Sequence, residues 1–162
     1  MAGTWFKVLW KFVASLVVCQ LAGAVGSVFT IRAIPVWYMT LVKPVITPPN
    51  WVFGPAWTAL YLLMGVSLFL LLHRGLHDAN ARAALALFSV QLGLNILWSV
   101  VFFGMRSPAG GAIEITILWG AILLAGLSLY RVSRPAGLLF VPYLLWVTFA
   151  AVLNYWIWAL NR

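Results

Sequence analysis

Charged side chains are the scarcest feature of this sequence. Its 162 residues include ten lysines and arginines and two acids, or 7% charged residues, where a soluble domain carries about 25%. The charges leave four uncharged runs, 12–31, 44–73, 83–105 and 135–161, and a fifth run, 107–130, whose one charge is Glu114. A helix of about 20 residues crosses a hydrocarbon core of about 30 Å, and each run reaches that length. The composition therefore excludes a soluble domain and predicts a single membrane domain over residues 1–162.

Lipid offers no hydrogen-bond partner to the backbone, so a run that crosses the bilayer must be helical. We therefore predict an all-α integral membrane protein, a five-transmembrane-helix bundle. The predicted helices cover about 8–31, 51–72, 83–104, 110–130 and 136–160. Asn50 is expected to cap the second helix, Pro55 to lie in its first turn, and Pro142 to bend the fifth.

Cysteine is as scarce as charge, because Cys19 is the one cysteine of the chain. This excludes an intrachain disulfide and a cysteine-based metal cluster. His73 and His77 have the i, i+4 spacing of a metal pair, but only Asp78 follows them closely, so no metal site is expected. We find no Ser-His-Asp set, no glycine-rich phosphate loop and no paired carboxylates. The basic residues stand singly or in pairs at span ends, where they anchor to headgroups, so nucleic acid binding is not expected.

One long connection, 32–50, separates the first two predicted helices, and it contains Pro35, Pro44, Pro48 and Pro49. Proline removes an N–H donor and restricts φ, so this segment is not a spanning helix. Ordered loops of this length are usually functional. We expect 32–50 to lie at the membrane surface and to act as the lid of a pocket.

Aromatic side chains are abundant, with ten tryptophans in the chain. Three predicted helices each place aromatic or amide side chains on one face, at spacings of three and four. The faces are Trp57, Tyr61 and Met64; Gln91, Asn95, Trp98 and Phe102; and Tyr143, Trp146, Ala150 and Asn154. Aromatic walls with a few amides suit a flat, apolar, conjugated ligand. Two plainer interpretations stay open: the rings only fill the core, and Asn95 only joins helices by a hydrogen bond.

Glu114 is the one acid inside a predicted span, about one turn from the start of the fourth helix. Two interpretations stay open for it. Its side chain extends to the interface as a structural feature, or it takes part in proton or ligand coupling.

Three stretches of the chain carry a resemblance to a known family. They are Trp37-Tyr38-x4-Lys43-Pro44-x3-Pro48-Pro49-x-Trp51-Val52-Phe53-x-Pro55-x-Trp57-Thr58-x-Leu60-Tyr61-x2-Met64-Gly65, Gln91-Leu92-x-Leu94-Asn95-x2-Trp98-x3-Phe102-Phe103-Gly104, and Pro142-Tyr143-Leu144-x-Trp146 followed by Leu153-Asn154. The sequence resembles the translocator protein family, also called tryptophan-rich sensory proteins or peripheral benzodiazepine receptors. The stretches occur in the family's order and span nearly the whole chain.

The resemblance implies a five-helix bundle, a homodimer, and a pocket closed by the loop between the first two helices. It also implies protoporphyrin or heme-like tetrapyrroles and benzodiazepine- or isoquinoline-type compounds as ligands, beside membrane lipid. Carried over by position, the pocket includes Ser27, Phe53, Trp57, Asn95, Trp98, Trp146, Ala150 and Leu153. Tyr61 and Tyr143, which lie on the aromatic faces described above, are further candidate ligand-binding residues.

Two departures from the family pattern bear on ligands. The sterol motif of animal members requires a base within about five residues after its tyrosine, but six residues separate Tyr155 from Arg162, so sterol binding is not favoured. Some animal members also have a tryptophan early in the fourth helix, where this chain has Gly110.

These observations favour a receptor-like membrane protein that binds porphyrins and similar planar hydrophobic ligands, for tetrapyrrole transport or stress sensing, and that requires no cofactor. One alternative is an enzyme that degrades protoporphyrin in light, with Trp57 or Trp146 as catalytic electron donor. Another is a small hydrophobic-molecule transporter. A bacterial envelope membrane is favoured over the mitochondrial outer membrane.

Overall fold

The computed structural model describes the backbone from Ala2 to Arg162 and the side chains from Trp5 onward. Over these residues the chain forms helices joined by turns, with no strand. The helices are α1 (Ala2–Ala33), α2 (Asn50–Arg74), α3 (Ala79–Ser99), α4 (Pro108–Val132), α5 (Arg134–Leu138) and α6 (Val141–Leu160). A 3-10 turn, η1 (Tyr38–Thr40), lies in the long loop, and a π-helical turn, η2 (Val100–Gly104), extends α3.

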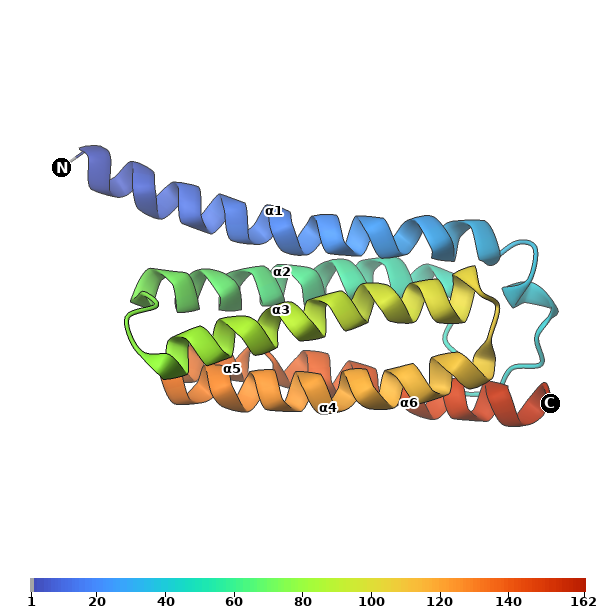
Figure 1. Ribbon diagram of the computed structural model, residues 1–162. Coiled ribbons are helices and arrows are strands. Elements are labelled where there is room, and N and C mark those ends of the chain that lie inside the picture. Colours follow the sequence, from blue (N-terminus) through green and yellow to red (C-terminus); the bar gives the residue numbers. More distant parts are fainter. Residues whose placement is uncertain (1) are drawn as a thin grey trace.

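Five helical segments of the described chain are long and apolar enough to cross a membrane, so the predicted five-helix bundle is confirmed. The segments are Trp5–Ala33, Asn50–Arg74, Ala79–Gly104, Pro108–Val132 and Arg134–Leu160. The helices run side by side, with α1 along one side of the bundle and the described ends of the chain far apart (Figure 1). Packing is most extensive between α3 and α4 and between α1 and α2.

The fifth span departs from its prediction, because it consists of two helices rather than one bent helix. The chain turns at Leu139 and Phe140, and α6 begins at Val141, which places Pro142 in its first turn. A proline inside a helix removes a hydrogen bond and its ring meets the preceding turn, whereas the first turn tolerates both effects. Pro142 therefore marks the start of α6.

The start of α2 also differs from its prediction. Asn50 is the first helical residue, so Pro49 occupies the cap position and no side chain caps the helix. The Asn50 amide donates instead to the Met39 sulfur at 3.6 Å. Because the helix begins at Asn50, Pro55 lies beyond the first turn. Two other helices have side-chain caps: Asp78 accepts from the Ala81 N–H at 2.7 Å, and Ser107 accepts from the Gly110 N–H at 3.0 Å.

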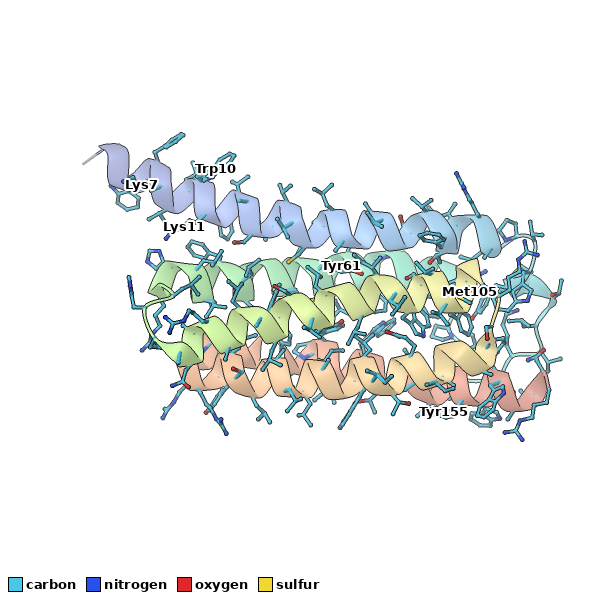
Figure 2. All side chains as sticks on the ribbon, in the orientation of Figure 1. Lys7, Trp10, Lys11, Tyr61, Met105 and Tyr155 are labelled. Carbon is cyan, nitrogen blue, oxygen red and sulfur yellow. The ribbon has the colours of Figure 1, made fainter. Side chains whose placement is uncertain are left out.

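Glycine allows close contacts between helices at two positions of the α1–α2 pair. A Cβ added to Gly65 would lie 2.9 Å from the Leu16 Cα, and one added to Gly23 would lie 2.5 Å from the Tyr61 ring. Tyr61 lies between α1 and α2 (Figure 2). Cys19, between these positions on α1, is fully buried and packs in the core, as expected of a small packing residue.

The turn between α4 and α5 depends on a third glycine. A Cβ on Gly137 would lie 2.5–2.7 Å from the Cβ, Cα and N atoms of Tyr130. We expect Gly137→Ala to lower the free energy of unfolding by about 1–3 kcal/mol, because main-chain atoms must shift to admit the methyl group. Gly120→Ala is the matched control, since its Cβ would meet nothing within 4 Å; it should be neutral or stabilising by up to about 1 kcal/mol. Unfolding of the purified protein in detergent measures both, and equal stabilities would contradict this account.

Candidate functional site

A cavity of about 480 Å³ lies within the bundle, between α1, α2, α3 with η2, and α6. This volume is in the range of small-molecule binding sites. None of its lining side chains is charged. The lining comprises Gln20, Gly23, Ala24, Gly26, Ser27, Thr30, Ile31, Ile34, Tyr38, Asn50, Phe53, Gly54, Trp57, Thr58, Tyr61, Asn95, Trp98, Ser99, Phe102, Phe103, Trp146, Ala150, Leu153, Asn154 and Ile157.

Nine of the ten predicted ligand-binding residues lie on the wall of this cavity. They come from four helices: Ser27; Phe53, Trp57 and Tyr61; Asn95 and Trp98; and Trp146, Ala150 and Leu153. The exception is Tyr143, which is fully buried behind the wall. The bundle thus brings the predicted residues together, while their binding of a ligand stays a prediction.

Asn95 connects two tyrosines across the bundle. The Tyr61 hydroxyl donates to Asn95 Oδ1, and Asn95 Nδ2 donates to the Tyr143 hydroxyl at 2.6 Å. All three side chains are buried, so these bonds join α2, α3 and α6 in the interior of the bundle. Both atoms of the amide are therefore already bonded, although Asn95 also borders the cavity. This geometry supports the interpretation of Asn95 as a link between helices.

A second polar link passes through Trp98 and Asn154. The Trp98 indole N–H donates to Asn154 Oδ1 at 3.0 Å, and Asn154 Nδ2 donates to the Pro108 carbonyl at 2.9 Å. Trp98 also stacks on Phe102, with ring centroids 5.2 Å apart and an interplanar angle of 16°. These contacts hold Trp98 in one orientation at the cavity wall.

The aromatic faces of α2 and α6 meet at the cavity, as the sequence predicts. Trp146 of α6 packs edge-on against Phe53 of α2, at 6.1 Å between centroids. Trp57 of α2 packs against Tyr143 of α6 at 6.3 Å and against Tyr61 at 5.8 Å. The Trp146 indole N–H is buried and has no hydrogen-bond partner among the described residues. Trp57 and Trp146 thus present large apolar surfaces to the cavity, and Trp146 also has a buried indole N–H that makes no hydrogen bond.

The long loop closes the end of the cavity. Tyr38 borders the cavity and packs against Phe103 with centroids 5.7 Å apart, and Lys43 Nζ lies 4.8 Å from the Tyr38 ring centroid. Burial raises the pKa of Tyr38, so its phenol stays neutral. Asn161 holds the loop to α6 with two bonds to the Val42 backbone, accepting from its N–H at 3.0 Å and donating to its carbonyl at 2.9 Å. The loop is ordered at this end; its movement as a lid stays a prediction.

Comparison of the sequence with known proteins identifies a family. The TspO/MBR family model matches residues 15–159. The chain belongs to the TspO/MBR family. Among its relatives, a tryptophan-rich protein TspO of Chlorobaculum tepidum is 46% identical over 88% of this chain and 90% of its own length. One of Archaeoglobus fulgidus is 43% identical over 93% and 97%. The Homo sapiens translocator protein is 37% identical over 78% and 75%.

One side of the cavity was missed by sequence reasoning for this TspO/MBR family chain. Helix α1 contributes Gln20, Ala24, Ser27 and Ile31 to the wall, yet only Ser27 was predicted. These positions follow the i, i+4, i+7, i+11 spacing of one helix face. The polar or small side chains of Gln20, Ala24 and Ser27 on a spanning helix are the signal that could have identified this wall.

Glu114 does not extend to the interface, which corrects one of its two interpretations. Its side chain is only 6% exposed, and neither carboxyl oxygen has a hydrogen-bond partner among the described residues. A Cβ built on Gly111, one turn earlier on the same face, would lie 2.6 Å from the Phe102 ring and 2.9 Å from Asn154 Oδ1, so this face of α4 is directed into the bundle. Glu114 lies outside the cavity lining, and a coupling role stays a prediction.

Proposed function

We propose that this membrane protein binds porphyrins and similar planar hydrophobic molecules in the cavity, for tetrapyrrole transport or stress sensing. The observation that carries the proposal is the wall itself, where Phe53, Trp57, Trp98 and Trp146 surround an uncharged space. Aromatic rings supply large stacking surfaces to a flat conjugated molecule, and such a site favours apolar cargo. Benzodiazepine- and isoquinoline-type compounds share this chemistry and are included in the proposal.

Relatives in Chlorobaculum tepidum and Archaeoglobus fulgidus support a prokaryotic setting. A bacterial envelope membrane is part of the proposal. The expected homodimer stays a prediction.

Light-dependent degradation of protoporphyrin is the second candidate. It is favoured by one observation, that the indoles of Trp57 and Trp146 both border the cavity. Indole is an easily oxidised side chain, so a bound porphyrin excited by light would have an electron donor beside it. Removing the donor would then stop the reaction without removing the binding site.

The test is quenching of tryptophan fluorescence by protoporphyrin in detergent, in the dark and under illumination. We expect saturable quenching in the dark, because a bound porphyrin lies against the cavity tryptophans. N-acetyltryptophanamide in the same micelles corrects for light absorbed by the porphyrin. Absence of saturable quenching would overturn the proposed function. Loss of porphyrin absorbance that requires both protein and light would favour the degrading enzyme over the binding protein.

A further inference from the structure

Helices α1 and α2 are in close contact over the half of the bundle remote from the long loop. Phe12 packs against Phe69 with centroids 5.2 Å apart, and a Cβ on Gly65 would lie 2.9 Å from the Leu16 Cα. Nearer the loop, a Cβ on Gly23 would lie 2.5 Å from the Tyr61 ring. These contacts leave little space between the two helices over this half of the bundle.

The same pair of helices is open between Gly23 and the loop. Ala24, Gly54 and Thr58 line the cavity and are also exposed on the outer surface of the bundle. A Cβ built on Gly54 would meet nothing within 4 Å. At the lower edge of this opening, Gln20 Nε2 donates to the Thr58 carbonyl at 3.1 Å. The cavity therefore opens between α1 and α2 along a mouth bordered by Gln20, Ala24, Gly54 and Thr58, and the lining residues Ile31 and Asn50, nearer the loop, are exposed as well.

The depth of the mouth places it against lipid. Gly54 lies four residues from the start of α2 at Asn50, and Ala24 lies nine residues from the end of α1 at Ala33. At 1.5 Å per residue these positions are about 6 Å and about 13 Å from the helix ends. With 25 residues α2 is about 37 Å long, whereas a hydrocarbon core is about 30 Å thick. Gly54 therefore lies near the boundary of the hydrocarbon core, and Ala24 lies deeper, on the side of the mouth that acyl chains reach.

On the side of η2, the loop packs over the end of the cavity. Trp37 and Tyr38 pack on Phe102 and Phe103, with centroid distances of 5.5 Å for Trp37–Phe102 and 5.7 Å for Tyr38–Phe103. Asn161 holds the Val42 backbone by two hydrogen bonds, at 3.0 Å and 2.9 Å. Entry from water at this end would have to separate this aromatic cluster and break both bonds.

We propose that the cavity takes up uncharged planar ring molecules directly from the hydrocarbon core, through the mouth between α1 and α2. This inference rests on the proposed function. The lining and the mouth carry no charged side chain, so an ionised carboxylate would lose its hydration without gaining a cationic partner. A porphyrin with esterified carboxyl groups therefore fits the route and the cavity better than the free acid.

The test measures the rate of tryptophan quenching after mixing proteoliposomes with vesicles that contain protoporphyrin dimethyl ester. Gly54→Leu fills the mouth and should slow association and dissociation alike, by about tenfold or more. Gly120→Leu is the matched control, because a Cβ there also meets nothing within 4 Å; its rates should equal wild type. Gln20→Ala removes the bond to Thr58 and should speed association. Asn161→Ala loosens the loop end and should leave the rates unchanged.

Four results would contradict the proposal or the function on which it rests. Faster association in Asn161→Ala with wild-type rates in Gly54→Leu would overturn the lateral route. Slower association of Gly54→Leu with unchanged dissociation would also overturn it, because the leucine would then occupy binding space. If Gly54→Leu fails to fold, Ala24→Leu fills the other side of the mouth and must give the same slowing. Tighter binding of the free acid than of the ester would overturn the uncharged class, whereas saturable binding of neither would overturn the proposed function itself.

Discussion

Trp57→Ala and Trp146→Ala are each expected to weaken porphyrin binding by about 1–3 kcal/mol, because each removes a ring that would stack on the ligand. Both rings border the cavity, and each is held by a neighbouring aromatic side chain, Tyr61 for Trp57 and Phe53 for Trp146. Titration of the fluorescence quenching of the remaining tryptophans gives the affinities. Wild-type affinity in both variants would remove the cavity as the binding site.

Trp146→Phe separates binding from catalysis at the same position. Phenylalanine keeps much of the apolar surface but lacks the indole N–H, which has no partner in the described structure, and the easily oxidised indole. We expect binding to weaken by less than about tenfold, or roughly 1.4 kcal/mol. If Trp146 is the electron donor of a degrading enzyme, the variant should no longer degrade porphyrin in light, although it still binds porphyrin.

The control for this variant is Trp158→Phe. Trp158 lies near the end of α6, outside the cavity lining, with the Arg162 guanidinium 4.5 Å from its ring centroid. The Trp158→Phe substitution should change neither porphyrin binding nor light-driven porphyrin loss. If light causes no protein-dependent loss in wild type, Trp146→Phe and Trp158→Phe alike, the protein is a binder and the enzyme alternative is wrong.

Asn95→Ala is expected to destabilise the bundle by roughly 2–4 kcal/mol, because it leaves the Tyr61 and Tyr143 hydroxyls without their partner in the core. Tyr143 is fully buried, so water cannot replace the lost amide there. The unfolding of purified protein in detergent measures this loss, and the same substitution tests the helix-linking interpretation of Asn95.

Ser89→Ala on the same helix is the control, since the Ser89 hydroxyl is exposed and bonds only to the Leu85 carbonyl of its own helix at 2.9 Å. It should leave the stability within about 0.5 kcal/mol of wild type. A stability of Asn95→Ala equal to that of Ser89→Ala would show that the Tyr61–Asn95–Tyr143 link contributes nothing to the fold.

The five spans could be predicted from sequence because crossing a bilayer is a local requirement. The absence of charged residues over a run of about 20 can be read directly from the sequence. Hydrogen bonds within the run pair its own backbone N–H and C=O groups, so the helix needs no partner from other segments. The faces of the helices could be predicted for the same reason. The 3.6-residue period alone places Asn95 with Trp98, and Trp146 with Ala150, on one side of their helices.

Tertiary structure decided how these faces are used, because periodicity does not specify which neighbour a face meets. Asn95 has its amide bonded to Tyr61 and Tyr143, and Tyr143 lies behind the wall that its face suggested it would line. Glu114 is buried because the packing of α3 and α6 encloses its side of α4, although its distance from the helix start suited the interface.

The sequence by itself therefore determined that the chain crosses a membrane, how many spans it has, and which residues form most of the aromatic wall. Only the packed bundle decided that α1 supplies a further wall and that exposed residues of α1 and α2 border the cavity. The physical reason is distance along the chain. Hydropathy and helix period are properties of one segment. A cavity and its opening depend on where two helices from distant parts of the sequence pack closely and where they do not.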